Sequence, residues 1–184
     1  MMKLSVVAVA ALVAASSAHA QVSLSAGALA GSFNCWQSLS CNAHEAAEAR
    51  NGVGGFLAAS LPLASWVRAG AELTLRHKDL GYKESRLTSA SVELQLRPTP
   101  LNGLWLRAAS GVGTSRESAH QVDDIVMGAE SRGVRINTIG ALYELRIADR
   151  VSLVPRGTVG WIGREQRLWD VGVGVTLAPA LRAR

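Results

Sequence analysis

Residues whose side chains could take part in catalysis lie close together between Ser118 and Asp124. Ser118, His120 and either Asp123 or Asp124 could supply a nucleophile, a general base and an orienting carboxylate, the three parts of a hydrolytic triad. The stretch is polar and lies between segments of alternating apolar residues, which predicts a surface loop. Because catalytic groups are best held on rigid elements, we expect solvated loop residues here and assign no catalytic residue and no cofactor.

A second pair with possible chemistry is formed by Cys35 and Cys41, the only two cysteines. In an oxidising compartment, cysteines this close in sequence are expected to form a disulfide that staples their loop. Such a crosslink is worth about 2 kcal/mol through the entropy of the unfolded chain. His44 and Glu45 lie nearby, but a metal site needs more ligands than this loop offers, so we predict no metal.

The N-terminus predicts export from the cytoplasm. Met1 to Lys3 is a short positive start, Leu4 to Ala15 is apolar, and Ala18-His19-Ala20 is a cleavage site before Gln21. The apolar run is too short to cross a bilayer as a helix. We therefore expect a signal peptide over residues 1–20, one domain over 21–177, and a short tail over 178–184.

The charge of the remaining chain argues against nucleic acid as a partner. Lys and Arg exceed Asp and Glu only modestly, and they are scattered rather than gathered in runs. Beyond the leader, the sequence has no stretch of about 18 apolar residues that would indicate a membrane helix. An exported β domain is therefore expected, either in the periplasm or in a membrane.

Eight segments alternate apolar with polar or small residues, the pattern of β-strands with two different faces. They cover residues 22–31, 52–60, 66–76, 89–97, 104–108, 133–147, 151–162 and 167–177. The clearest is Trp66 to Arg76, in which Val67, Ala69, Ala71, Leu73 and Leu75 oppose Arg68, Glu72, Thr74 and Arg76. The segment from Gly52 to Ser60 is rich in glycine, and its two faces cannot be assigned.

Long and short connections alternate between these segments. Residues 60–65, 97–103 and 147–150 form short turns, whereas 34–51, 77–85 and 114–132 are longer and polar. Short turns at one end and long loops at the other are typical of a bacterial outer-membrane barrel. The connection at 163–166 should belong to the long set and is short.

The aromatic residues favour the same interpretation. Trp161, Trp169 and Tyr143 fall on the apolar face near strand ends, where membrane interfaces favour amphipathic rings. Trp66 and Trp105 lie at strand starts and are expected to face inward.

If the apolar face meets lipid, the charged face must line a narrow lumen. Buried charges need partners, and the two signs are mixed, which predicts an internal ionic network. The residues expected in it are Arg68, Glu72, Arg76, Glu93, Arg107, Glu144, Arg146, Arg156 and Asp170.

With these features the chain resembles the small OmpA/OmpX-type family of eight-stranded outer-membrane proteins from Val22 to Leu177. Its last strand, with Asp170, Gly172, Val175 and Leu177, looks like the family's C-terminal signal for the outer-membrane insertion machinery. The resemblance implies an all-β fold, an eight-stranded antiparallel up-and-down transmembrane β-barrel in the bacterial outer membrane.

We expect a structural or interaction role, in envelope integrity, adhesion or contact with lipopolysaccharide, for a protein that works as a monomer. Three alternatives stay open: a lipid A modifying enzyme, although the loop residues do not match the His-x-Ser pattern of lipid A deacylases; a narrow channel for a small solute; and a soluble periplasmic barrel that binds a ligand on its apolar face.

Overall fold

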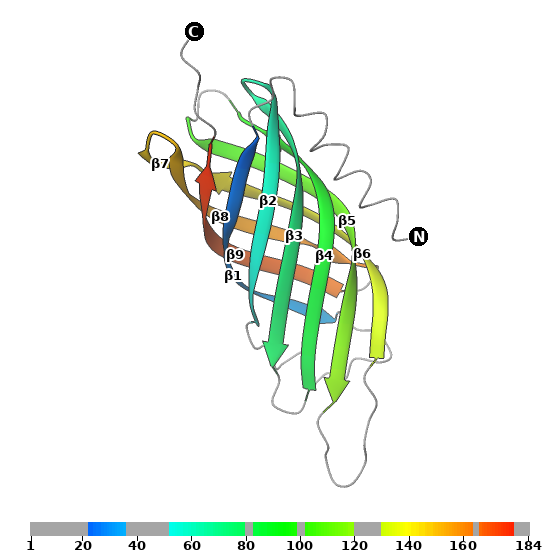
Figure 1. Cartoon of the computed structure of the whole chain (residues 1–184). Coiled ribbons are helices and arrows are strands. Elements are labelled where there is room, and N and C mark those ends of the chain that lie inside the picture. Colours follow the sequence, from blue (N-terminus) through cyan, green and yellow to red (C-terminus); the bar gives the residue numbers. More distant parts are fainter. Residues whose placement is uncertain are drawn as a thin grey trace.

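The computed structural model describes residues 22–35, 52–79, 83–98, 102–119, 130–163 and 166–178, and in these ranges the chain consists of strands and the turns between them. None of the described residues forms a helix long and apolar enough to cross a bilayer. The strands are β1 (Ser23–Cys35), β2 (Gly52–Ala64), β3 (Val67–Asp79), β4 (Lys83–Leu96), β5 (Leu104–Ala119), β6 (Glu130–Tyr143), β7 (Leu145–Ala148), β8 (Val151–Ile162) and β9 (Gln166–Leu177). All neighbours pair in antiparallel fashion (Figure 1).

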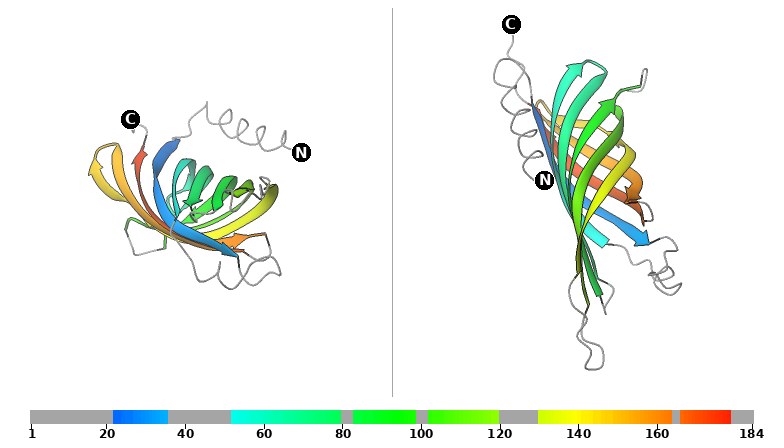
Figure 2. Two further views of the ribbon diagram at one scale, coloured as in Figure 1. Left: turned by 90° about the horizontal axis from the view of Figure 1, so that it is seen from below. Right: turned by 90° about the vertical axis from the view of Figure 1, so that its right-hand side faces the viewer.

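The strands close into a barrel because β6 pairs with β8, which joins the two sides of the sheet. A row of directly paired residues that starts at Val67 and is followed from strand to strand around the barrel returns to β3 at His77, ten residues further along. A shift of this size inclines eight strands by about 40° to the barrel axis. The slant is visible in Figure 2.

The barrel has its apolar residues outside. On β3, Leu73 and Leu75 are more than half exposed, whereas Glu72 and Arg76 are buried. The same division holds on β2, where Leu57 is exposed and Phe56 is buried, so the structure assigns the face that the sequence pattern left open. A water-soluble barrel has the opposite arrangement, and the soluble ligand-binding alternative is therefore wrong.

A proline interrupts one membrane-crossing segment. The pairs Leu142–Arg156 and Leu145–Leu153 share one register, which sets Pro155 opposite Tyr143. The N–H of Gly163 donates to the carbonyl oxygen of Arg135 in β6. The backbone N–H of every second residue back along β8 therefore points toward β6 and β7, and position 155 is one of them. Proline has no N–H to donate. The ladder breaks there, and β6 and β7 are one segment divided at Glu144.

The strands are longer at the loop end than the sequence predicted. β1 runs on to Cys35, β3 to Asp79, β5 to Ala119, and β4 and β6 begin at Lys83 and Glu130. The expected loops 34–51, 77–85 and 114–132 are therefore too wide. Apolar alternation ends where the lipid-facing belt ends, but backbone pairing continues beyond it, and β4 and β5 project past the other strands (Figures 1 and 2).

At the opposite end, β2 extends to Ala64 and leaves a turn of Ser65 and Trp66 before β3. Trp66 is in this turn and is 56% exposed, so the expectation that it faces inward is wrong. Trp105 does face inward and is 2% exposed. This end carries the start of β1 and the end of β9.

Candidate functional site

The lumen is filled by four layers of side chains, which are described from the terminal end, where β1 starts and β9 ends. The first layer is the apolar cluster of Trp105, Leu142 and Val154. The guanidinium of Arg68 stacks 3.8 Å from the centre of the Trp105 ring, and that of Arg97 lies 5.4 Å from it. A stacked cation over an indole face is an attractive contact, so both arginines help to hold the ring across the opening.

Arg68 also joins this layer to the charged interior. It donates two hydrogen bonds to the carboxylate of Glu144, from Nη1 to Oε1 and, at 3.1 Å, from Nη2 to Oε2. Both side chains are 20% exposed. The forked pairing of arginine with a carboxylate fixes the orientation of both groups.

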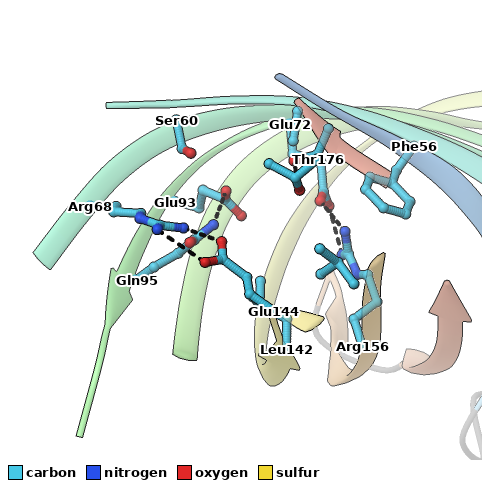
Figure 3. A pocket seen from close by; sticks show the side chains of 13 residues that line it. Phe56, Ser60, Arg68, Glu72, Glu93, Gln95, Leu142, Glu144, Arg156 and Thr176 are labelled. Carbon is cyan, nitrogen blue, oxygen red and sulfur yellow. Dashed lines mark hydrogen bonds and ion pairs between the residues drawn. The ribbon is translucent and has the colours of Figure 1, made fainter. Parts of the chain in front are cut away.

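The second layer is a buried ionic cluster of two acids and two arginines. Arg107 donates to Glu72 at 3.1 Å and lies 2.7 Å from Glu93. Arg156 makes two hydrogen bonds to Glu72, and Gln95 donates to Glu93 at 2.6 Å. Figure 3 shows Arg156 beside the ring of Phe56, whose centre is 4.3 Å from the guanidinium carbon.

The third layer links β3 to β9. Arg76 donates to Asp170 at 2.7 Å and to Thr74 at 2.8 Å, and the Thr74 and Ser89 hydroxyls are hydrogen-bonded. The side chains of Arg76 and Asp170 are almost completely buried. This layer extends the ionic network toward the loop end.

The fourth layer is again apolar. Leu87, Ile136, Ile162 and Leu168 come from four strands, and each is at most 4% exposed. Val134 packs against them. The charged layers therefore lie between two apolar seals.

Four arginines and four acids of these layers carry equal numbers of positive and negative charges. Arg68, Arg76, Arg107 and Arg156 face Glu72, Glu93, Glu144 and Asp170, and each of these eight residues forms at least one ion pair. Removing one member of a buried pair leaves an uncompensated charge at a cost of several kcal/mol. A cavity beside the second layer has a volume of about 20 Å³, which is room for about one water molecule.

The outer surface carries a belt of apolar residues with aromatic rings at both edges. Trp161 and Trp169 are 47% and 43% exposed at the loop end, and Tyr143 is 41% exposed toward the terminal end. Between them, outward residues such as Leu57, Val92 and Val173 are also exposed. A lipid-facing band bordered by aromatic rings is typical of membrane barrels.

Solved structures of outer-membrane proteins share this architecture. The barrel matches Ail, the attachment invasion locus protein of Yersinia pestis, with a TM-score of 0.58 and 10% identity over 87% of this chain and 99% of Ail. It matches a major outer membrane protein of Thermus thermophilus with a TM-score of 0.58 and 12% identity, over 86% and 99% of the two chains. For Neisserial surface protein A the TM-score is 0.55 and the identity 12%, over 85% and 96%.

The chain has the fold of the eight-stranded outer-membrane β-barrels. The sequence comparisons add no closer relative, since no family model and no curated protein matches the chain. At identities this low the likeness concerns the fold alone.

In this outer-membrane barrel, eight of the nine residues expected in the lumen network lie inside, and Arg146 does not. Its side chain is 68% exposed and contacts Asp149 at 3.4 Å in the turn after β7. β5 begins at Leu104, opposite Tyr143, so β5 does not extend alongside β7. The alternating pattern placed Arg146 on the inward face, but β7 extends beyond the start of β5, so the side chain of Arg146 is not enclosed by the barrel.

Several lumen residues were not singled out from the sequence. Phe56 was missed because the faces of β2 could not be assigned, and Trp105 was noted as inward without a role. Thr74 and Gln95 were placed on the inward faces. They were not assigned to the network because they are uncharged. Each of them bonds an ion two residues away on its own strand, Arg76 for Thr74 and Glu93 for Gln95, so the same-face spacing of a strand is a signal that could have found both.

The expected insertion signal lies along β9. Asp170 points into the lumen, Val175 and Leu177 face outward, and Gly172 lies against β1. A Cβ at Gly172 would come within 2.6 Å of Ala28 and Leu29. Glycine therefore allows the close approach of β9 and β1.

The possible catalytic and disulfide residues fall mostly outside the described ranges. Cys35 ends β1 and Ser118 lies in β5, but their side chains are not among those described, and Cys41, His120, Asp123 and Asp124 lie in undescribed segments. The described residues contain no group of three or more His, Cys, Asp or Glu placed to hold a metal ion.

Proposed function

We propose that this outer-membrane barrel is an integral protein of the bacterial outer membrane that does not conduct solutes. In this proposal it serves as an anchor, and its loop end contacts lipopolysaccharide, the host or envelope partners. Its physiological role would be in envelope integrity or adhesion. The signal peptide would direct export, and β9 would be recognised by the insertion machinery.

The observation that carries this proposal is the filling of the lumen. The apolar layers at Trp105 and at Leu87 close both ends, and the two layers between them are occupied by paired charges. An eight-stranded barrel has an interior just wide enough for its own side chains. The surface beyond the membrane is then the part that is free to act.

The long strands at the loop end support a role in contact. β4 and β5 extend past the other strands (Figure 2), which would raise the loops above the membrane surface. One crystal structure of Ail is a complex with sucrose octasulfate, a heparin analogue. By analogy, we propose that anionic saccharides or lipopolysaccharide are among the contacts of this barrel.

Two measurements test the proposal. The protein should fractionate with outer membranes, and its gel mobility in detergent should change on boiling, because a closed barrel resists unfolding until heated. In planar bilayers, the purified protein should give no steady conductance steps. Reproducible conductance steps would show that the barrel is a narrow channel and not a closed anchor. Recovery of the protein from the soluble periplasm would reject the membrane location.

A further inference from the structure

Two exposed arginines flank a tryptophan at the loop-end border of the apolar belt. Arg167 of β9 is directly opposite Trp161 of β8, and Trp161 is opposite Asn137 of β6. Arg135 is two residues beyond Asn137 on the same outward face, and both arginines are exposed. Two strand spacings and two residues along a strand separate the Cα atoms of the arginines by about 12 Å.

The residue that lies beside Arg135 on the β8 side is a glycine. This is Gly163, whose N–H donates to the Arg135 carbonyl oxygen at 2.7 Å. It has a φ of 64°, and a Cβ at this position would meet nothing within 4 Å. Gly163 therefore places no side chain beside Arg135 at this level.

The level of this surface relative to the membrane follows from its neighbours. Below Arg167 on β9, the outward residues are Trp169, Val171 and Val173, and all three are exposed. Below Arg135 on β6, the belt begins again at Ile139. Since Trp residues mark the membrane interface, the two guanidinium groups lie at the depth of lipid headgroups.

The charge of the surface fits an anion. Among the described residues Arg135 forms no ion pair, and the outward residues beside it, Val112, Gly133 and Asn137, carry no carboxylate. Arginine presents a planar set of donors that matches the oxygens of a phosphate. The outer face of an outer membrane supplies phosphate on its glycolipid.

We propose that Arg135, Trp161 and Arg167 form a binding site for the phosphate of an outer-leaflet glycolipid. The ring of Trp161 would lie below the phosphate, where the sugar of the lipid meets its acyl chains. The inference rests on the proposed membrane location and names one contact of the loop end. It assigns to these three residues a role that is separate from the ionic network of the lumen.

The test is lipid retention by the purified protein, measured by native mass spectrometry with lipid A that carries two phosphates and with lipid A whose phosphates have been removed. The wild type should prefer the phosphorylated form. Arg135→Gln or Arg167→Gln should each lower that preference about fivefold, and the double variant about 25-fold, as expected for about 1 kcal/mol per cation near a lipid surface. The pair R135K/R167K should keep more of the preference than R135Q/R167Q.

The matched control is Arg116→Gln, which removes an exposed, outward-facing arginine of β5 above this level. It should leave the preference unchanged within a factor of two. The inference is overturned if R135Q/R167Q keeps the full preference, if R116Q loses as much, or if millimolar inorganic phosphate displaces the lipid completely, which would indicate a site for free anions. Each variant is first checked for outer-membrane location and heat-modified mobility, so that failure of the membrane assignment is distinguished from failure of the site.

Discussion

Arg76 of β3 reaches across the lumen to Asp170 of β9, with 2.7 Å between Nη2 and Oδ2. The two strands are not neighbours, because β2 and β1 lie between them in the sheet. This ion pair therefore ties opposite parts of the wall together through the interior.

Asp170→Asn should destabilise the barrel by about 3–5 kcal/mol, because it leaves the Arg76 guanidinium buried without a counter-charge. The free energy of unfolding in denaturant, measured in phospholipid vesicles, checks this. The double variant R76M/D170L, which removes both charges, should recover most of the loss. A single variant that unfolds like the wild type would mean that water reaches Arg76.

Leu57→Arg should destabilise by about 2–4 kcal/mol, because Leu57 faces outward near the middle of the apolar belt. Leu63→Arg is the matched control on the same strand. Leu63 is near the end of β2, next to the turn at the terminal end, and the cost there should be about 0–1 kcal/mol. Equal effects at the two positions would contradict the lipid-facing assignment.

Leu87→Ala should cost about 2–5 kcal/mol, since it leaves a cavity in the apolar layer above the ions. Leu73→Ala, on the outer face, should cost only the transfer term of about 2 kcal/mol because lipid can fill the space. The comparison uses the same unfolding assay. If the two losses are the same, the layer at Leu87 is not tightly packed.

Pro155→Ala should stabilise the barrel by about 1 kcal/mol, because it restores a backbone N–H opposite Tyr143. Hydrogen exchange at residue 155 in the variant should be as slow as at its β8 neighbours. Fast exchange there would show that the ladder stays broken for another reason, such as the position of Glu144.

Cys35 and Cys41 are expected to be oxidised in the exported protein, and the chain should then carry no free thiol. Reduction should lower the free energy of unfolding by about 2 kcal/mol. Thiol labelling under denaturing conditions, with and without reductant, gives the result. Two reactive thiols in unreduced protein would argue against the disulfide.

The sequence predicted the strands and their faces wherever apolar alternation was continuous. Residues 151–162 were expected as a strand with the same ends as β8, because a turn with Asp149 and Arg150 precedes it and Gly163 follows. The faces of 66–76 and 89–97 were also correct, and the exposures of Leu73 and Glu93 confirm them. Between Gly52 and Ser60, small residues occupy both faces, so the phase could not be determined.

What could not be predicted depends on the register between strands. The pattern indicated that Glu72 and Arg156 face inward, but only the ten-residue shift around the barrel brings them together. The same reasoning explains Arg146, whose phase is inward although no wall stands opposite it. Strand ends above the apolar belt escaped prediction because backbone hydrogen bonds, rather than lipid, hold residues such as Arg116 in β5.

The origin of the charge pairs has a consequence for assembly. β3 supplies Arg68, Glu72 and Arg76, and their partners lie on β5, β8 and β9 and at the break between β6 and β7. A partly built sheet would carry these ions into the bilayer without partners. Intermediates that lack the last strands are therefore disfavoured, and folding within the membrane should be all-or-none.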